Sequence, residues 1–273
     1  MEYREEPVSR IIDASRPSFA RMNNWFLGGH EHYEADRQVG RELLDMAPST
    51  RELVRNNRLF LERAVGVLAK EYGVRQFLDH GSGLPLPKNV HQVAQQVDQD
   101  ARVVYIDNDP HVHAHARSLL DANDETVVIQ ADITDTDAIF GHPDVAELLD
   151  LTRPVAALFT SVLHCLPDEV GPGELVRRVA ERLPTGSFVV LSHLVSDESA
   201  MREKATAFMR HYFGSGWGRV RARHEVESYV ADFDILDPPG HLVEVSRWRP
   251  DTEVAPRQRS QEWIEYGGVA CIR

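Results

Sequence analysis

The chain has 273 residues, of which 42% are hydrophobic and 27% charged, and its formal net charge is −13. A chain of this length buries a substantial core as one domain, or as one domain with added helices. The negative charge argues against a nucleic acid partner, because a phosphate backbone binds best to a basic face.

The sequence carries no signal for export or membrane insertion. Residues 1–13 have mixed charge without the apolar stretch of a signal peptide, and no later segment offers the roughly 20 uninterrupted apolar residues of a membrane span. Its two cysteines, Cys165 and Cys271, each lie inside an apolar run, as packed thiols do in a reducing compartment. We therefore expect a cytoplasmic protein with no membrane partner. The sequence does not address its oligomeric state.

The first part of the chain follows a helical pattern. Between residues 48 and 72, Ser49 or Thr50 is suited to cap a helix. The residues along one stripe of that helix are Leu53, Asn57, Phe60, Leu61, Ala64, Val67 and Leu68. We predict an N-terminal helical extension over residues 1–72 that packs as a lid on a core formed by residues 73–273, within one compact domain.

After residue 73, short apolar runs alternate with helical stretches. The runs predicted as strands are residues 74–80, 101–107, 126–132, 154–164 and 187–194. Their nearly continuous apolar character is typical of parallel strands that are covered on both faces. The predicted helices are residues 88–97, 110–120, 144–151, 173–183 and 203–213.

The tail differs from the rest of this region. Residues 241–250 and 262–273 are two alternating runs with a polar stretch between them, which predicts a closing antiparallel pair. Taken in order, the elements predict a doubly wound, mostly parallel α/β sheet behind a helical extension.

Acidic residues end three of the predicted strands. The first strand ends at Asp79, just before a glycine turn at residues 81–83, the second at Asp107 and the third at Asp132. In open α/β sheets, ligands bind outside the carboxyl ends of the strands. One such aspartate is ordinarily a helix cap or a solvated loop residue, but three at one edge predict a binding site.

The glycine turn distinguishes between two kinds of nucleotide. It has the pattern G-x-G-x-P, so the third glycine of a dinucleotide fingerprint is missing, and the prolines remove amide donors that a phosphate needs. Asp79 would also repel a pyrophosphate at close range. S-adenosylmethionine is a cation without phosphate, and its ammonium, ribose hydroxyls and adenine amine all bind to acidic groups.

We therefore predict a site for S-adenosylmethionine, with S-adenosylhomocysteine as the product. We expect Asp79 to face the ammonium, Asp107 to bind the ribose hydroxyls and Asp132 to accept from the adenine amine. Gly81 and Gly83 let the backbone approach the ligand closely. The remaining expected contacts are Ser82, Ile133, which packs on the adenine ring, and Ser161 at the end of the fourth strand.

Long stretches spread over nearly the whole chain form one recognisable pattern. They are FARMNNWFLGGHEHYEADR, NNRLFLERAV, RQFLDHGSGLPLPKNVHQVAQ, DARVVYIDNDP, RPVAALFTSVLHCLPDE and GSFVVLSHL. This pattern resembles an actinobacterial family of S-adenosyl methyltransferases first catalogued as a domain of unknown function. The resemblance implies a class I methyltransferase core with a seven-stranded sheet, and it adds Asn108 to the cofactor contacts. It implies no acceptor, and Asn24, Trp25, Leu86 and Thr134 depart from the family's usual residues.

The aromatic residues Trp25, Phe26 and Tyr33 surround Gly28 and Gly29. One interpretation is a lid that folds over the cofactor with the glycines as its hinge. The other is a tight turn between two packed helices. The family resemblance favours the pocket-lining role.

Methyl transfer from a sulfonium is an in-line displacement that positioning and the exclusion of water accelerate. A general base is needed only when the nucleophile must lose a proton. His164, at the end of the predicted fourth strand, is the candidate base, and a hydrogen-bonded shoulder of the pocket is its alternative role. His193, on the fifth strand, has the same status with less support.

Two further patterns receive structural interpretations. His111 and His115 share a helix face at the i, i+4 spacing of some metal sites. No third acidic or imidazole ligand lies near them in the sequence pattern, so we predict a surface helix and no metal site. Residues 210–225 combine basic and aromatic side chains, but in so acidic a chain we predict a solvated loop and helix end rather than an RNA-binding segment.

The principal hypothesis is a methyltransferase that uses S-adenosylmethionine and acts on a small-molecule acceptor. The alternative is a protein of the same fold that binds this cofactor or its demethylated product as a sensor or partner, without turnover. An oxidoreductase that uses NAD(P) is disfavoured by the incomplete glycine fingerprint.

Overall fold

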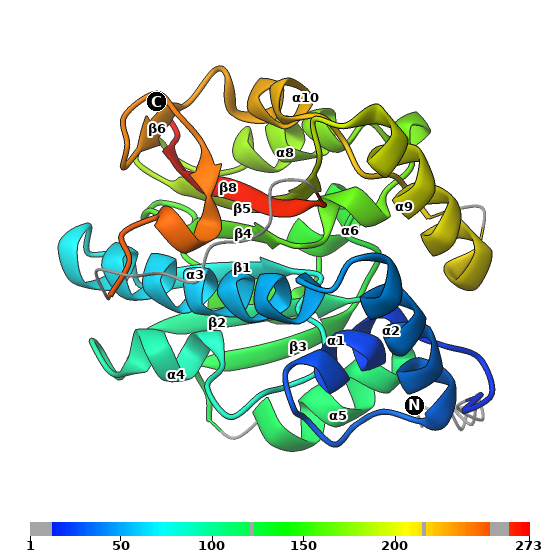
Figure 1. Ribbon diagram of the computed structural model, residues 1–273. Helices are drawn as coiled ribbons and strands as arrows, with labels where there is room; N and C mark the ends of the chain where they lie inside the picture. Colours follow the sequence, from blue (N-terminus) through cyan, green and yellow to red (C-terminus); the bar gives the residue numbers. More distant parts are fainter. Residues whose placement is uncertain (1–12, 121–122, 215–216, 252–261) are drawn as a thin grey trace.

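The computed structural model describes residues 13–120, 123–214, 217–251 and 262–273, and its centre is one eight-stranded sheet (Figure 1). The strands follow the order β3-β2-β1-β4-β5-β8-β6, and β7 pairs with β8 off that path. The strands are β1 (Gln76–His80), β2 (Arg102–Asp107), β3 (Thr126–Gln130), β4 (Ala156–Thr160), β5 (Phe188–Val195), β6 (Asp234–Leu236), β7 (Val243–Glu244) and β8 (Ile264–Cys271).

The pairing directions confirm the predicted mixed sheet. β1 pairs in parallel with β2 and β4, β2 with β3, and β4 with β5. β8 is antiparallel to β5 along its whole length, and β6 and β7 are antiparallel to β8. The strand order reverses between β1 and β4, so the carboxyl ends of these two strands border the crevice where α/β sheets bind ligands.

The strand predicted over residues 241–250 is mostly wrong. Only Val243–Glu244 pairs, after which the chain turns into a short 3-10 helix. Val245 and Trp248 are buried against helix α3 (Thr50–Glu71), and the Arg63 guanidinium of that helix donates to both of their carbonyl oxygens. These side-chain hydrogen bonds satisfy carbonyls that a strand partner would otherwise bind.

Helices cover both faces of the sheet (Figure 1). Helices α3, α4 and α5 share an apolar cluster with Phe77, and α6, α7 and α8 share another with Leu78, because neighbouring strand residues point to opposite faces. The α-helices are α1 (Phe19–Phe26), α2 (Glu34–Met46), α3 (Thr50–Glu71), α4 (Val90–Gln95), α5 (Pro110–Leu120), α6 (Thr136–Phe140), α7 (Pro143–Leu148), α8 (Pro172–Ala180), α9 (Ser199–Phe213) and α10 (Arg223–Glu227). The short 3-10 helices are η1 (Leu163–Cys165), η2 (Asp168–Val170), η3 (Ser228–Val230) and η4 (Val245–Arg247). Within the described ranges, no helix is both long and apolar enough to cross a bilayer.

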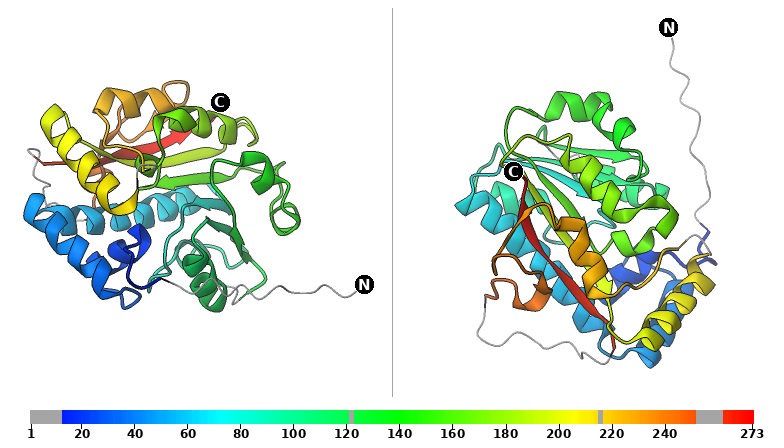
Figure 2. Two further views of the ribbon diagram at one scale, coloured as in Figure 1. Left: turned by 90° about the vertical axis from the view of Figure 1, so that its right-hand side faces the viewer. Right: turned by 90° about the horizontal axis from the view of Figure 1, so that it is seen from above.

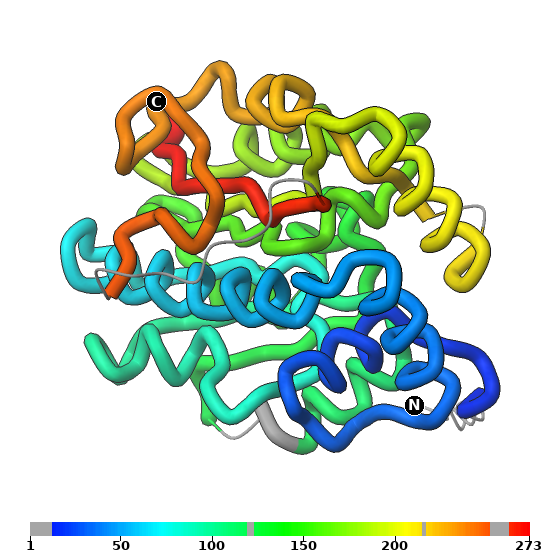
Figure 3. Tube along the Cα trace, in the orientation of Figure 1, coloured from blue at the N-terminus to red at the C-terminus, as the bar shows by residue number. Residues whose placement is uncertain are grey.

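A third apolar cluster joins the N-terminal helices to the far end of β5. Met22 of α1, Val39 of α2 and Leu53 of α3 pack with Met209 of α9 and Leu194 of β5. Figure 2 shows α1, α2 and α9 gathered at one end of the sheet, and the trace in Figure 3 follows α3 from this group across the sheet face. The cluster therefore places α1 close to the carboxyl ends of the parallel strands.

A buried carboxylate fixes the start of α1 to α2. Asp36 is fully buried and accepts hydrogen bonds from the backbone N–H of Ser18, the backbone N–H of Tyr33 and the guanidinium of Arg21. Its ion pair with Arg21 is itself buried, which requires that all these polar groups find partners. Asp36 thus sets the path by which the chain enters α1.

The segment 210–225 is not the solvated loop that its composition predicts. Trp217 is 5% exposed and Arg221 only 1%. Arg221 donates to carbonyl oxygens in the loop after β4 and pairs with the Asp168 carboxylate. Its guanidinium can be buried because these carbonyls and the Asp168 carboxylate supply it with hydrogen-bond partners. Residues 215–216, like residues 1–12 of the N-terminal extension, lie outside the described part of the chain.

Candidate functional site

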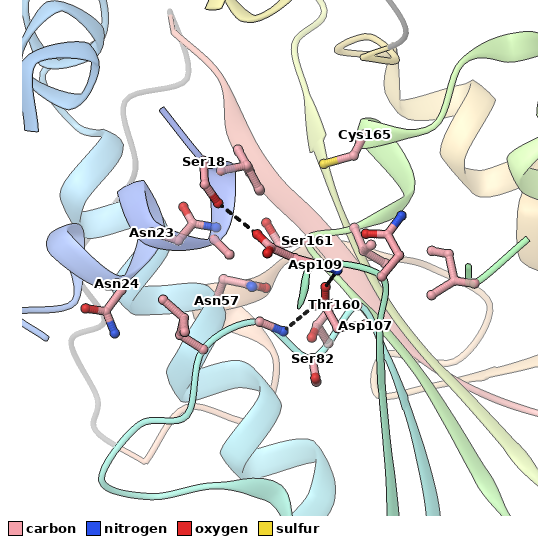
Figure 4. A pocket seen from close by; sticks show the side chains of 18 of the residues that line it. Ser18, Asn23, Asn24, Asn57, Ser82, Asp107, Asp109, Thr160, Ser161 and Cys165 are labelled. Carbon is pink, nitrogen blue, oxygen red and sulfur yellow. Dashed lines mark hydrogen bonds between the residues drawn. The ribbon is translucent and has the colours of Figure 1, made fainter. Parts of the chain in front are cut away.

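A cavity of about 520 Å³ lies at the carboxyl ends of β1, β2 and β4 (Figure 4). This volume falls in the range of small-molecule and cofactor sites. The cavity extends from the glycine turn after β1, past the acidic loops after β2 and β3, to the end of β4, and α1 and α3 provide the opposite wall. Of the predicted cofactor contacts it contains Gly81, Ser82, Gly83, Asp107, Asn108, Asp132, Ile133 and Ser161.

The turn after β1 has the backbone conformation that only glycine adopts freely. Gly81 and Gly83 have φ of 72° and 66°. A Cβ on Gly81 would lie 2.4 Å from a methyl group of Val162, whereas nothing lies within 4 Å of one on Gly83. The Gly81 N–H donates to the Ile106 carbonyl at 2.8 Å, so the turn is fastened to β2.

Asp107 organises the loop after β2. Its Oδ2 accepts from the Gly83 N–H and its Oδ1 from the Asp109 N–H, both at 2.9 Å. Burial raises the pKa of Asp107, and the two backbone donors oppose that shift. Asp109 in turn caps α5 through the His111 N–H and accepts from the Ser18 hydroxyl of the segment before α1 (Figure 4). Asp107, the ribose-binding candidate, is therefore held between the glycine turn and the loop before α5, and both of these reach the cavity.

The loop after β3 presents one exposed carboxylate and one buried apolar side chain. Asp132 Oδ1 accepts from the backbone N–H of Thr134 at 2.9 Å and from its hydroxyl at 2.8 Å. Ile133 is 7% exposed and also lines the cavity. Both residues thus reach the cavity, and their contacts to an adenine amine and an adenine ring stay a prediction.

Asp79 is the predicted cofactor residue that does not reach the cavity lining. It is buried on the face of β1 that α3 covers, below Arg58, which does line the cavity. Burial raises the pKa of Asp79 to about 7, and the nearby Arg58 guanidinium lowers it in part. Asp79 is therefore not placed to contact a bound ammonium directly.

A buried polar network backs the end of β4. Ser161 has a left-handed φ of 56°, and its N–H donates to Ser192 Oγ at 2.9 Å. Its hydroxyl donates to Glu265 Oε1 at 2.5 Å, while the Ser192 hydroxyl donates to Asn57 at 2.6 Å. Burial raises the pKa of Glu265 to about 8, and its hydroxyl partners oppose the shift.

His164 and His193, the two candidate bases, lie outside the described cavity lining. His164 is fully buried in η1, is absent from the described lining, and accepts at Nδ1 from the Leu194 N–H at 3.3 Å. Burial, together with the nearby Arg221 guanidinium, lowers its pKa to about 3. His193 is also fully buried, and its Nε2 lies 3.1 Å from Arg221. This geometry is that of the alternative role, a structural shoulder of the pocket.

The predicted lid residues form the turn between α1 and α2. Gly28 has a φ of 80°, and a Cβ on Gly29 would overlap the Asn24 side chain. Trp25 packs against Gly40 of α2, and Arg51 lies over the rings of Trp25 and Phe26. Tyr33 is 37% exposed and contacts His111 edge to face. The aromatic side chains therefore pack the two helices together, and Phe26 reaches only a small apolar hollow behind the main cavity.

The neighbouring face of α1 lines the cavity instead. Phe19, Asn23 and Leu27 lie one helical turn apart on this face, and Ser18 precedes them. Sequence reasoning missed these residues and also Glu265. The signal for Glu265 was a charged residue inside the otherwise uncharged, mostly apolar run of residues 263–272, where a carboxylate needs a specific partner.

The comparisons with known proteins identify the family of the chain. The model of a family described as S-adenosyl methyltransferase matches residues 5–273. The chain belongs to this family. The solved structure of a candidate methyltransferase from Thermobifida fusca YX is 37% identical, with a TM-score of 0.88, and the match covers 96% of this chain and 97% of that one. A DUF574 family protein from Streptomyces avermitilis MA-4680 is 34% identical, also at 0.88, over 96% and 99%. No curated protein matches the chain.

Family membership establishes the class I methyltransferase fold and S-adenosylmethionine as the cofactor. The residues at the cavity fit that molecule. The glycine turn brings backbone without side chains next to the acidic loops, and the turn lacks the third glycine of a phosphate-binding fingerprint. When bound, the cofactor supplies an electrophilic methyl group on a sulfonium. Of the residues that line the cavity, Asp107 would hold the ribose, and Asp132 and Ile133 would hold the adenine, as the sequence predicts.

Proposed function

We propose that this protein transfers the methyl group of S-adenosylmethionine to a small-molecule acceptor that enters the cavity between α1 and the end of β4. The observation that supports this most is the division of the cavity into two unlike sides. Acidic loops line one side, and the other side carries apolar side chains, among them Phe19, Val54 and Leu61, interspersed with polar ones such as Asn57 and Arg58. A small hollow lined by Met22, Phe26 and Leu53 adjoins the second side. We therefore expect the acceptor to carry an apolar part that packs against these side chains, with polar groups beside it.

The chemistry we propose depends on position more than on a base. α1 and α3 enclose the reacting groups, and the exclusion of water strengthens each electrostatic contact inside. When bound, the cofactor would supply an electrophilic methyl group to the acceptor and would leave as S-adenosylhomocysteine, while α1 and α3 hold the two molecules in position. His164 then shapes the pocket beside that reaction, since its ring lies behind the lining.

The test of cofactor binding is titration calorimetry with S-adenosylmethionine, S-adenosylhomocysteine and NAD. We expect both adenosyl ligands to bind and NAD not to bind. Asp107→Ala should weaken adenosyl binding by roughly 10- to 100-fold, since hydrogen bonds to charged groups contribute about 1.5–3 kcal/mol. Asp100→Asn, at an exposed aspartate outside the cavity lining, is the matched control. Equal binding by Asp107→Ala and the wild type would refute the ribose assignment.

Turnover is tested separately from binding. With a pool of apolar small molecules that carry hydroxyl or amine groups, the wild type should release S-adenosylhomocysteine and Asp107→Ala should not. If the cofactor binds but no member of such pools is methylated, the result favours the alternative of a sensor or partner protein.

A further inference from the structure

One buried histidine beside the cofactor loops has no hydrogen-bond partner. His111 lies in the first turn of α5, two residues after Asp109, and is 4% exposed. Neither of its ring nitrogens has a hydrogen-bond partner among the described residues. Asp109 caps only its backbone N–H. Burying a polar ring without a partner is unfavourable, so an explanation for this side chain is needed.

Two further ligand-bearing side chains lie next to this ring. His115, one turn later on α5, stacks on His111 with ring centroids 4.6 Å apart and an interplanar angle of 15°. Glu31, from the turn between α1 and α2, places Oε2 3.4 Å from His115 Nε2. One ligand atom from each residue lies within 4.8 Å of the others. The third ligand that the local sequence pattern lacks thus comes from a distant part of the chain.

Glu31 is held where it is by its own loop. Its backbone N–H donates to Asn24 Oδ1 at 3.0 Å, and the Gly29 N–H donates to the Asn24 carbonyl at 2.9 Å. Asn24 is 4% exposed, and Gly29 packs so closely on its side chain that a Cβ would lie 2.3 Å from Oδ1. These contacts fix the backbone at Glu31, from which its partly exposed side chain extends towards α5.

An ordinary ion pair explains only part of this arrangement. A charged His115 beside Glu31 would account for those two side chains, but it would leave His111 buried without a partner. Tyr33 meets the His111 ring edge to face and leaves its two nitrogens unbonded. A ligand that accepts lone pairs from imidazole nitrogens and a carboxylate together accounts for all three side chains.

We propose that Glu31, His111 and His115 bind a divalent first-row transition metal ion of the zinc type. Two imidazoles and one carboxylate are the donor set that Zn²⁺ takes in three-ligand sites, with water in the fourth position. Zinc–nitrogen bonds of about 2.0–2.1 Å bring tetrahedral ligand atoms to roughly 3.3 Å apart. The three ligand atoms lie within 4.8 Å of one another, so rotation of the side chains brings them to this spacing as the stacked rings turn towards the ion.

The consequence of this site is a link between two elements that border the cofactor cavity. Glu31 belongs to the turn that follows α1, and His111 and His115 belong to the helix that follows Asp107 and Asp109. A bound ion would hold α1 against the ribose side of the cavity. Its role is positioning, and it is independent of whether the protein turns over an acceptor.

The test uses the full chain, stripped with a chelator, and the metal ions alone. Titration with Zn²⁺ should give one site per chain, and Co²⁺ should produce visible d–d absorption bands of a four-coordinate nitrogen and oxygen site. Glu31→Gln and His115→Gln should each weaken Zn²⁺ binding at least tenfold. Both positions are partly exposed, so that folding of these variants is not the limiting factor. His111→Asn tests the buried ligand in the same way.

The matched control is His142→Gln, because His142 lies beside Asp144 as an ordinary histidine–carboxylate pair. It should bind Zn²⁺ like the wild type. Zn²⁺ should also raise the melting temperature of the wild type and of the control, and should leave that of Glu31→Gln unchanged. Binding that is absent, or that is equal in the wild type, Glu31→Gln and His115→Gln, would overturn the proposal. S-adenosylhomocysteine affinity of the stripped protein is measured separately, so a failed metal site and a failed cofactor site give different results.

Discussion

Two buried carboxyl groups near the cavity have pKa values close to neutrality. Asp79 lies below Arg58 on the α3 face of β1, and burial raises its pKa to about 7. Glu265 lies on β8 behind Ser161, and burial raises its pKa to about 8. A buried acid of this kind can change its charge when a ligand or the solution pH changes. The consequences differ because the two groups face different neighbours.

The affinity for S-adenosylmethionine should rise with pH between pH 6 and pH 8. With its pKa at about 7, Asp79 is largely protonated at the lower pH and ionised at the higher, and the cationic ligand favours the ionised form. The expected gain is up to roughly tenfold per pH unit below the pKa. Calorimetry at pH 6, 7 and 8 measures it, and Asp79→Asn should bind more weakly with no such trend. A flat wild-type profile would show that Asp79 interacts with Arg58 and not with the ligand.

The stability of the folded protein should fall with rising pH, in part through Glu265. Its folded pKa of about 8 lies above the unfolded value of 4.5, so the folded state binds more protons between these two values. Ionisation across this window costs at most about 4–5 kcal/mol. Glu265→Gln keeps a neutral acceptor for Ser161 and should lose less stability between pH 5 and pH 8.5. Urea denaturation at both pH values measures the difference; parallel losses in the two proteins would contradict the assignment.

At the scale of elements, the glycine turn after β1 and the loop after β4 depend on each other. Val162 fills the space beside Gly81, and the Gly81 N–H is bonded to β2. The turn is thus shaped by contact with a segment about 80 residues away in the chain. A side chain at Gly81 meets that segment, whereas one at Gly83 meets open space.

Gly81→Ala should destabilise the protein more than Gly83→Ala. Both variants place a Cβ at positive φ, which costs about 1–2 kcal/mol, but only the first also overlaps Val162. The overlap should add about 1–3 kcal/mol, as overpacking does. Denaturant titration of the two variants compares them directly. In the double variant Gly81→Ala/Val162→Ala, part of the loss should return; an additive loss would rule out the contact as its cause.

At the scale of the whole molecule, the start of β8 meets the start of α3, beside the small hollow next to the cavity. The Trp263 indole N–H donates to the Thr50 hydroxyl, and the Ser49 hydroxyl donates to Glu262, so the start of β8 fastens the start of α3. Ser49 therefore occupies the predicted cap position but bonds to the C-terminal segment instead of its own helix. A ligand in the cavity touches both the N-terminal helices and the sheet.

Cofactor binding should accordingly stabilise the entire fold. A ligand present at 100 times its Kd adds about 2.7 kcal/mol to the free energy of unfolding, which for a chain of this size raises the melting temperature by about 5 °C. S-adenosylhomocysteine should give this shift in a thermal melt, and NAD at the same concentration should not. The shift should shrink in Asp107→Ala; an undiminished shift would place the ligand away from the ribose candidate.

Much of the cofactor side was predictable because it depends on local order in the sequence. Asp107 and Asp132 follow parallel strands, and parallel strands bring their carboxyl ends to one edge. Asp79 follows the same rule yet points under α3, since its position in β1 has the parity of Phe77 and not of Leu78. Packing decides which face of the sheet a helix covers, so the sequence pattern could not show that Asp79 lies near the Arg58 guanidinium.

The sequence by itself determined the alternation of strands and helices, the glycine turn and the acidic strand ends, because each depends on residues that are neighbours in the chain. Only the tertiary structure decided which side of α1 faces the cavity, since Trp25 packs on Gly40 and turns the Phe19 and Asn23 side inward. It also decided that Glu265 lies behind Ser161 and that Glu31 meets His111 and His115. Those groups come together through contacts between distant segments, and the periodicity of one segment contains no information about the partner it will meet.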